Sequence, residues 1–198
     1  MNSDIMETST NNNIRNSKIK KYIPFINKLL VSCMGFYFYL CCDEYNYFFT
    51  KKVLFSYTST YYIIETFVYF YNKEYIFIPH HFCTLGMLYF FYNFPFHLLK
   101  PVLLGMGIIE KSGAITDYRD ILKHDNQLTL FYDVSFLLYY ISIRQFYFAY
   151  HIYYDYPLDT IEQKINVFFL SLLYIMSFYW SIIWTKSIIK YNKLLKND

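Results

Sequence analysis

The chain alternates long apolar stretches with short polar segments. Six stretches carry almost no charged residue, and four of them have 20 residues or more. A helix of about 20 residues crosses the ~30 Å hydrocarbon core of a bilayer, and a soluble domain of this size rarely contains four such stretches. The pattern therefore predicts an all-α fold, a polytopic transmembrane helix bundle. The stretches are residues 22–42, 53–72, 75–93, 101–109, 127–150 and 165–185.

The region 75–109 is open to two interpretations, because Pro79, Pro95 and Pro101 interrupt it. Proline ends or kinks a helix at the preceding residue. The region is therefore either one long kinked span or two shorter spans separated near residues 94–100. We favour two spans, the second tilted or incomplete, which gives about six spans in total.

The basic residues are distributed unevenly between the two sides of such a bundle. With six spans, both termini and the loops after the second and fourth spans share one side, and the positive-inside rule places that side in the cytosol. Residues 1–21 are then a flexible cytosolic tail, 22–190 the transmembrane domain and 191–198 a short basic cytosolic tail. The cytosolic side holds Arg15, Lys18, Lys20, Lys21, Lys73, Lys111, Arg119, Lys123, Lys186, Lys190, Lys193 and Lys196, and the other side Lys51, Lys52, Lys100 and Lys164.

Aromatic residues are unusually frequent, and they change how the hydropathy is read. The 25 Tyr, 21 Phe and 2 Trp make up 24% of the 198 residues, whereas a disordered chain is poor in aromatics. The mean hydropathy of +0.17 is low for a membrane protein, because the scale penalises Tyr, whose ring is apolar except at its hydroxyl. The composition of 56% hydrophobic and 17% charged residues therefore agrees with a membrane bundle.

Net charge and cysteine content narrow the range of partners and cofactors. A net charge of +3 is only mildly basic, and no nucleic-acid partner is expected. The four cysteines form no CxxC pattern, so we expect neither a disulfide framework nor a metal site.

The stretch 53–72 carries a polar stripe with a carboxylate in its middle. At 100° per residue, Tyr57, Tyr61, Glu65 and Asn72 fall within about 80° of one another on a helix. Such a stripe is expected to face the interior of the bundle rather than lipid. Two roles for Glu65 remain open: a protonated carboxyl group bound to a neighbouring helix, or a contact with a ligand.

Three more ionisable residues lie within the apolar stretches. Asp133 and Arg144 are separated by about three helical turns, so they share a face but lie ~16 Å apart and cannot pair. Arg144 therefore needs a carboxylate from another helix, and Glu65 and Glu110 are the candidates. Lys28, near the start of the first span, is expected to extend its amino group to the membrane interface.

The adjacent His80 and His81 open the third stretch. Neighbouring positions lie 100° apart on a helix, which does not match the i, i+4 pair that binds zinc. Thr84 is close enough to fix the tautomer of a histidine ring through a hydrogen bond. A neutral imidazole can act as general base or nucleophile in acyl transfer, and a purely structural role is the alternative.

Taken together, these motifs resemble those of the TLC-domain family of polytopic lipid proteins, which includes ceramide synthases and smaller proteins of lipid homeostasis. The resemblance covers about residues 22 to 190 and lies in the order and spacing of five motifs. The matching residues are Tyr61 and Glu65 before the double His, His80 and His81 with Thr84 in the HHxxT position, Glu110, Ser112 and Arg119 in an E-x-S-(x)n-R pattern, Arg144 in the next span, and Tyr179 and Trp180 in the last.

The resemblance implies a multi-pass protein of the endoplasmic reticulum whose helices enclose a cavity for lipid chains. In the ceramide-synthase branch the His pair is associated with acyl transfer from acyl-CoA to a sphingoid amine, which makes His80 and His81 candidate catalytic residues. That branch also carries an HD-x-SD element, whereas this chain has GMGIIEKSG in the equivalent region. The chain is therefore more similar to the small, non-synthase members.

Three functions follow as hypotheses. The first is binding or sensing of a polar membrane lipid, ceramide or a phospholipid, in lipid homeostasis. The second is a ceramide-synthase-like N-acyltransferase that uses acyl-CoA and a sphingoid base, with no other cofactor, and the third is a lipid transporter or cargo receptor. A homo-oligomer is compatible with each. The residues expected to line the cavity beside the two histidines are Tyr61, Glu65, Thr84, Glu110, Asp133 and Arg144.

Overall fold

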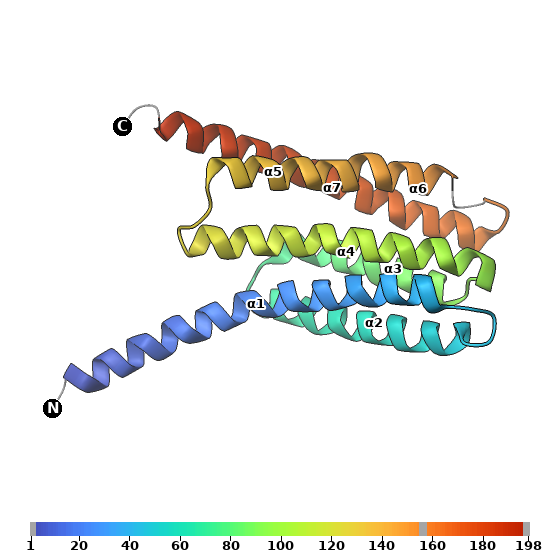
Figure 1. The fold of residues 1–198 in the computed structure, drawn as a ribbon, viewed down its shortest axis with the longest axis horizontal. Helices are drawn as coiled ribbons and strands as arrows, with labels where there is room; N and C mark the ends of the chain where they lie inside the picture. Colours follow the sequence, from blue (N-terminus) through green and yellow to red (C-terminus); the bar gives the residue numbers. More distant parts are fainter. Residues whose placement is uncertain (1–2, 155–157, 196–198) are drawn as a thin grey trace.

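The computed structural model describes the backbone of residues 3–154 and 158–195, and the side chains of residues 22–95, 98–150, 152 and 158–190. This part of the chain is all-α and contains no strand (Figure 1). Its elements are α1 (Ser3–Cys41), α2 (Tyr47–Tyr71), the short 3₁₀ helix η1 (Tyr75–Phe77), α3 (Ile78–Tyr92), α4 (Phe96–His124), α5 (Leu130–Ile141), the π-helical segment η2 (Ser142–Tyr147), α6 (Phe148–Tyr154) and α7 (Ile161–Leu195).

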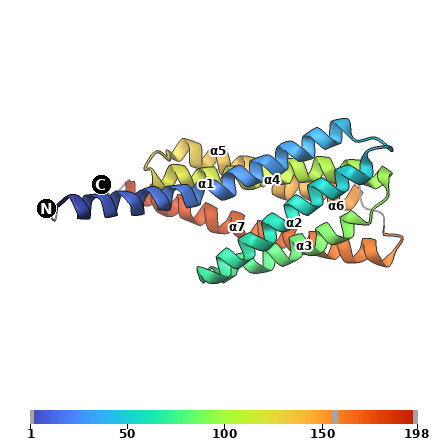
Figure 2. The ribbon, with the colours of Figure 1, turned by 90° about the horizontal axis from the view of Figure 1, so that it is seen from below.

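The helices run back and forth along one direction, and both chain ends lie at the same end of the bundle (Figure 1). Because η1 continues into α3, and α5, η2 and α6 follow one another without a break, the elements form six helical segments in the described part of the chain. α1 packs most extensively against α4, whereas α3 lies between α2 and α7 (Figure 2). The number and order of segments match the six apolar stretches.

The region 75–109 forms two helices, as expected, but the second is longer than predicted. α3 ends at Tyr92 and α4 begins at Phe96 after the extended Pro95. Pro101 lies in the second turn of α4 without ending it, and the helix runs on to His124, 29 residues in all. The apolar stretch 101–109 is therefore one part of a longer helix.

In the N-terminal region, residues 3–21 belong to α1, so the helix begins before the apolar span. The sequence contains no Gly or Pro before Pro24, so neither of the two strongest helix breakers interrupts the helix in this direction. Polarity indicated where the apolar span begins, but it did not indicate where the helix begins.

Local hydrogen bonds fix where two of the later helices begin. Thr160 Oγ1 accepts from Gln163 N at 3.2 Å, and Gln163 Oε1 accepts from Thr160 N at 2.9 Å, which forms a capping box at the start of α7. The Thr129 hydroxyl accepts from Tyr132 N and caps α5. The chain reverses after α2 and α4 at Lys73 and Asn126, which have positive φ angles of 61° and 56°.

A glycine lets α1 and α4 approach closely. A Cβ atom at Gly35 would lie 2.8 Å from Gly107 N and 2.9 Å from Leu103 O, both backbone atoms of α4. One turn away, Ser32 Oγ donates to Gly107 O at 2.7 Å. This contact brings the two helix backbones together, as small residues do in helix pairs within membranes.

Two helices are long and apolar enough to cross a membrane, over residues 22–41 of α1 and 161–190 of α7. A buried helix of a soluble protein passes the same test, but only 17% and 28% of the most apolar windows of these two helices are buried. Large apolar side chains also remain exposed on the other helices, among them Phe67, Tyr71, Phe131 and Phe146, each more than 70% exposed. The outer surface is thus rich in aromatic and aliphatic groups.

Candidate functional site

Buried ionisable side chains gather at one level inside the bundle. Lys28, His81, Glu110 and Arg144 each lie about 10 to 14 residues, or ~15–21 Å, from the helix end remote from the chain termini. His81, Glu110 and Arg144 are all less than 10% exposed. Helices that are distant in sequence thus place acidic, basic and imidazole groups in the same layer.

The His81 ring bridges α3 and α2. Its Nδ1 atom lies 3.0 Å from Thr66 Oγ1, and its Nε2 atom lies 3.3 Å from Glu65 Oε2. Tyr69, one turn beyond Glu65, donates to Glu65 Oε1 over 3.4 Å. Of the two roles left open for Glu65, this geometry matches the contact with a neighbouring helix.

His80 points in a different direction from His81 and contacts aromatic rings. Its ring centroid lies 5.2 Å from that of Trp180 and 6.4 Å from that of Tyr62. The Nδ1 atom is buried and has no hydrogen-bond partner among the described side chains. His80 therefore retains a ring nitrogen that is free for a ligand.

Thr84 does not fix a histidine tautomer, contrary to the expectation. Its hydroxyl donates to the backbone carbonyl of His80 at 2.9 Å, one turn back on α3. This local bond is the usual choice for a threonine within a helix. Thr66 on α2, which the sequence did not single out, occupies the position expected for Thr84.

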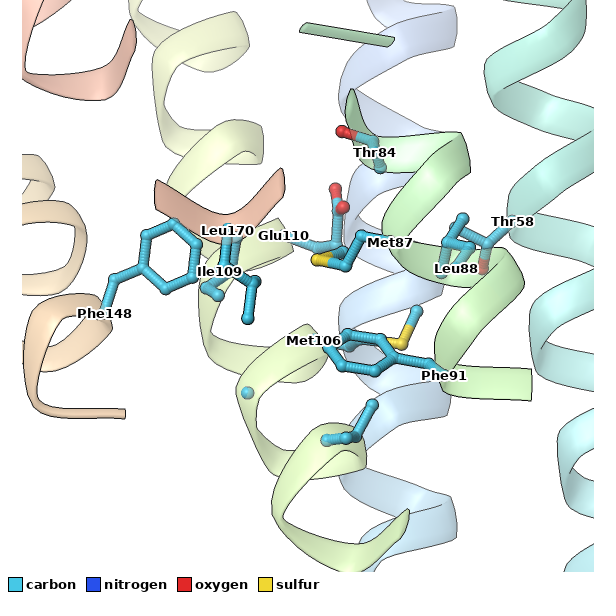
Figure 3. Close-up of a pocket in the computed structure, with 12 residues that line it drawn as sticks. Thr58, Thr84, Met87, Leu88, Phe91, Met106, Ile109, Glu110, Phe148 and Leu170 are labelled. Carbon is cyan, nitrogen blue, oxygen red and sulfur yellow. The ribbon is translucent and has the colours of Figure 1, made fainter. Parts of the chain in front are cut away.

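Glu110 accepts a hydrogen bond from α2 and borders a small cavity. Tyr62 OH donates to Glu110 Oε1 at 2.6 Å. The cavity measures about 30 Å³, and Figure 3 shows the Glu110 carboxyl group pointing toward the side where Thr84 lies. This volume holds about two water molecules, so the closed bundle has no room here for a lipid head group.

The lining of this cavity is mostly apolar, and only two of the residues expected to line a lipid cavity border it. They are Thr84 and Glu110. Of the rest, Glu65, His80, His81 and Arg144 belong to the same polar layer but lie outside this lining, and Asp133 belongs to a separate cluster. The lining residues are Thr58, Thr84, Met87, Leu88, Phe91, Val102, Gly105, Met106, Ile109, Glu110, Phe148 and Leu170.

The polar stripe of α2 faces inward over most of its length. Tyr61 and Glu65 are buried, and Tyr57 donates to Asn27 Oδ1 at 2.8 Å. The Tyr61 hydroxyl is buried near Glu65 without a hydrogen bond of good geometry. Asn72 is exposed at the end of α2, so the prediction is wrong for this residue.

Arg144 is bound by neutral groups instead of by a carboxylate. Its Nε donates to Ser112 Oγ at 2.7 Å, and its Nη2 donates to Ile109 O at 3.1 Å. No ion pair with Glu65 or Glu110 forms among the described side chains, because His81 and Tyr62 bind those carboxyl groups. The expected direct pairing is therefore wrong. The segment that carries Arg144 is π-helical, a geometry often found at functional sites.

Lys28 pairs with a carboxylate of α4. Its Nζ lies 3.0 Å from Asp117 Oδ1 and 2.9 Å from Asp117 Oδ2 on α4. The stem passes over Gly113, where a Cβ atom would lie 3.1 Å from Lys28 Cδ. Asp117 was not singled out as a partner, because it lies in a polar segment outside the apolar stretches.

Asp133 belongs to a second cluster closer to the chain termini. It accepts from Arg119 Nε at 2.6 Å and from Trp184 Nε1 at 2.6 Å. The Arg119 guanidinium also stacks over the Trp184 ring, 4.6 Å from its centroid. Asp133 and Arg144 both reach α4, as their shared helix face predicted, but Asp133 lies in an ion pair apart from the histidines.

The structure thus brings Glu65, His80, His81, Glu110 and Arg144 into one polar layer. Sequence analysis missed Tyr62, Thr66 and Asp117, which provide the direct partners. No group of three or more His, Cys, Asp or Glu side chains is arranged to hold a metal ion in the described part of the chain. The polar layer supplies hydrogen-bond donors and acceptors, charges and imidazole rings.

Comparison with known proteins gives no match: no family model fits the chain, and neither a curated protein nor a solved structure is significantly similar to it.

Proposed function

We propose that this chain is a multi-pass membrane protein that binds a polar lipid through the buried polar layer and acts in membrane lipid homeostasis. The observation that carries the proposal is the contrast between an apolar exterior and an interior that holds Glu65, His81, Glu110 and Arg144. Ionisable groups inside a membrane are costly, and they are usually retained for a function.

The proposal includes six membrane spans in the endoplasmic reticulum, with both termini in the cytosol. Two observations support it. Successive helical segments run in opposite directions. Lys and Arg are more frequent at the end of the bundle where α1 begins and α7 ends. The chain has no N-x-S/T site, so an inserted glycosylation acceptor reports location without background. An acceptor inserted at residues 42–46 should be glycosylated and one at 125–129 should not. The reverse result would overturn this orientation.

Lipid binding requires the layer to open, because the cavity next to Glu110 holds only about two water molecules. The contacts that must separate are those between α2 and α3 at Glu65 and His81, and between α2 and α4 at Tyr62 and Glu110. A polar head group would then meet the free His80 Nδ1 atom together with the Glu65 and Glu110 carboxyl groups.

The direct test is crosslinking of photoactivatable lipids to the purified protein, combined with lipidomics of cells that lack it. We expect ceramide or phospholipid labelling that decreases in His80→Ala and Glu65→Gln. The matched control is Lys111→Gln, which changes an exposed residue beside Glu110 on the same helix. Labelling that is equal in all variants, with unchanged lipid classes in the deletion cells, would refute lipid binding.

An N-acyltransferase is the second candidate, and the free Nδ1 atom of His80 favours it. In this reaction the sphingoid amine attacks the thioester of acyl-CoA, the amide bond forms, and free CoA leaves with the proton. A ring nitrogen without a partner is available to accept the amine proton. Purified protein with acyl-CoA and a sphingoid base should form an N-acyl product that is lost in His80→Ala. Absence of product excludes the reaction, and labelling without product supports binding alone.

A lipid transporter or cargo receptor is the third candidate, because a polar layer of this kind also suits transport. Movement of a lipid between the leaflets of proteoliposomes would distinguish it from a binding protein.

A further inference from the structure

Glu65, Thr66 and His81 form a buried polar contact between α2 and α3. Glu65 and Thr66 are consecutive on α2, and the His81 ring of α3 lies between their side chains. His81 is 3% exposed and Glu65 is 6% exposed. Water therefore does not separate these groups. Each hydrogen-bond donor among them must face an acceptor.

The hydrogen of the Thr66 hydroxyl fixes the tautomer of His81. Thr66 Oγ1 donates to the backbone carbonyl of Tyr62 at 2.7 Å, which uses its single hydrogen. Toward His81 Nδ1, at 3.0 Å, Thr66 can therefore only accept. The Nδ1 atom carries a hydrogen, and in a neutral ring the lone pair lies on Nε2.

The Nε2 atom lies 3.3 Å from Glu65 Oε2, within ion-pair distance but without hydrogen-bond geometry, so Oε2 is a buried acceptor that no other group satisfies. A neutral ring next to an ionised carboxylate would place two lone pairs opposite each other in a buried site, where the unfavourable contact is strongest. One additional proton removes the conflict. It lies either on the carboxyl oxygen, which then donates to Nε2, or on Nε2, which then donates to the carboxylate.

We propose that Glu65 and His81 form a proton-binding site in the membrane interior, in which one exchangeable proton joins α2 to α3. When the proton moves within the site, the O–H bond of Glu65 breaks as the N–H bond of His81 forms, and the pair stays neutral overall. When the proton leaves, the pair carries one negative charge and loses the attraction between its two members. The contact between α2 and α3 therefore depends on the proton. This inference does not depend on the identity of a lipid.

Charged and titratable groups of every neighbouring helix surround the pair. The cations favour loss of the proton, and the carboxyl groups oppose it. Tyr69, which is half-buried, donates to Glu65 Oε1. The surrounding groups are Lys28 of α1, Tyr61, Tyr62 and Tyr69 of α2, His80 of α3, and Glu110 and Asp117 of α4. Arg144 of η2 acts on His80 and Glu110, and so reaches the pair through them.

Infrared spectroscopy and ¹⁵N-histidine NMR of the full-length protein in detergent test the proposal. We expect one of two signatures at neutral pH. Either Glu65 gives the C=O stretch of a protonated carboxylic acid, or His81 gives the signals of a doubly protonated ring. Glu65→Gln should abolish the first signature or neutralise the ring in the second, and His81→Asn should shift the Glu65 band.

Glu110→Gln is the matched control, because it removes another buried carboxyl group that does not contact His81. Both the Glu65 and the His81 signals should remain in this variant, and only the pH at which they titrate should fall, because the Glu110 carboxyl group opposes loss of the proton. Thr66→Val has nearly the same shape as the wild-type residue and should shift the ring toward the other tautomer, which gives a second readout if Glu65→Gln does not fold. A carboxylate at Glu65 together with a neutral His81 ring in the wild-type protein would overturn the proposal.

Discussion

Asp133 joins three helices through one carboxylate, and its replacement by leucine is expected to destabilise the bundle. The carboxylate accepts from Arg119 Nε at 2.6 Å, from Arg119 Nη2 at 3.3 Å and from Trp184 Nε1 at 2.6 Å. Leucine has a similar size but accepts no hydrogen bond. Arg119 would then keep its charge while its side chain is only 12% exposed.

The size of the effect follows from these contacts. Breaking a buried ion pair by removing one partner costs about 3–5 kcal/mol. Arg119 retains its hydrogen bond to Asp120 at 3.1 Å and its stacking on Trp184, which favours the lower end of the range. We expect Asp133→Leu to lower the free energy of unfolding by about 3 kcal/mol, and Arg119→Met by a similar amount.

The double variant Asp133→Leu, Arg119→Met separates the ion pair from packing. It leaves no unpaired charge, and its main remaining cost is the Trp184 N–H without an acceptor, about 1–3 kcal/mol. The double variant should therefore lose no more than either single variant, a coupling of about 3 kcal/mol. Asp120→Leu is the control, because its side chain is 68% exposed, and it should change stability by less than about 0.5 kcal/mol.

Unfolding in detergent, followed by tryptophan fluorescence, is the assay. The protein has two tryptophans, so a Trp180→Phe background leaves Trp184 as the only indole, next to the site of the change. An Asp133→Leu variant within about 1 kcal/mol of the parent, or a double variant that loses the full sum, would refute the assigned geometry.

Three further changes test other contacts by the same unfolding measurement. Gly35→Ala places a methyl group 2.8 Å from a backbone nitrogen of α4 and should cost about 2 kcal/mol. In the control Gly107→Ala the methyl group meets only the Phe36 ring, at 3.2 Å, and the loss of stability should be smaller. Equal losses would contradict the close approach of the two helices. Tyr62→Phe removes the donor to Glu110 Oε1 and should cost about 1–3 kcal/mol. A loss near zero would contradict this and would show that water in the adjacent cavity replaces the hydroxyl group. Ser112→Ala leaves Arg144 Nε without its acceptor and should cost about 1–3 kcal/mol. Ser112→Thr retains a hydroxyl group and serves as the control. Equal losses in both variants would show that the hydroxyl group does not stabilise the protein.

The sequence predicted the positions of the helices well, because long apolar stretches and proline breaks are local signals. The break between α3 and α4 near Pro95 follows directly from such a signal. Helix ends in polar segments were predicted poorly, since polar residues such as those of 3–21 or 110–124 form helix as readily as apolar ones. Polarity marks the border of the apolar span and does not mark the end of the helix.

The sequence singled out several of the polar residues that lie close together inside the bundle, but not the partner that each one contacts. Buried charges could be recognised because they stand out in apolar stretches, as Glu65 and Arg144 do. Their partners could not, since the spacing along one helix does not specify which residue of another helix lies opposite. Lys28 illustrates this limit, because its partner Asp117 is 89 residues away and lies in a polar segment.

The charges of the buried groups provide an independent argument for the shared proton. In the layer and the adjoining cluster, the described cations are Lys28, Arg119 and Arg144, and the carboxyl groups are Glu65, Glu110, Asp117 and Asp133. Asp117 balances Lys28, and Asp133 balances Arg119. Arg144 donates to the carbonyl of Ile109, next to Glu110, which makes Glu110 its nearest counter-charge along α4.

With these pairs assigned, Glu65 is the single carboxyl group without a cation of its own. An ionised Glu65 beside a neutral His81 would leave one uncompensated negative charge in a site that excludes water, at high cost. A proton shared with His81 makes the pair neutral and balances the whole set. The same accounting predicts that Arg144→Gln, which removes one cation, makes the Glu65–His81 pair hold its proton more tightly. If the infrared or NMR signature of the pair titrates at the same pH in Arg144→Gln and in the wild-type protein, the buried groups do not form one electrostatic set.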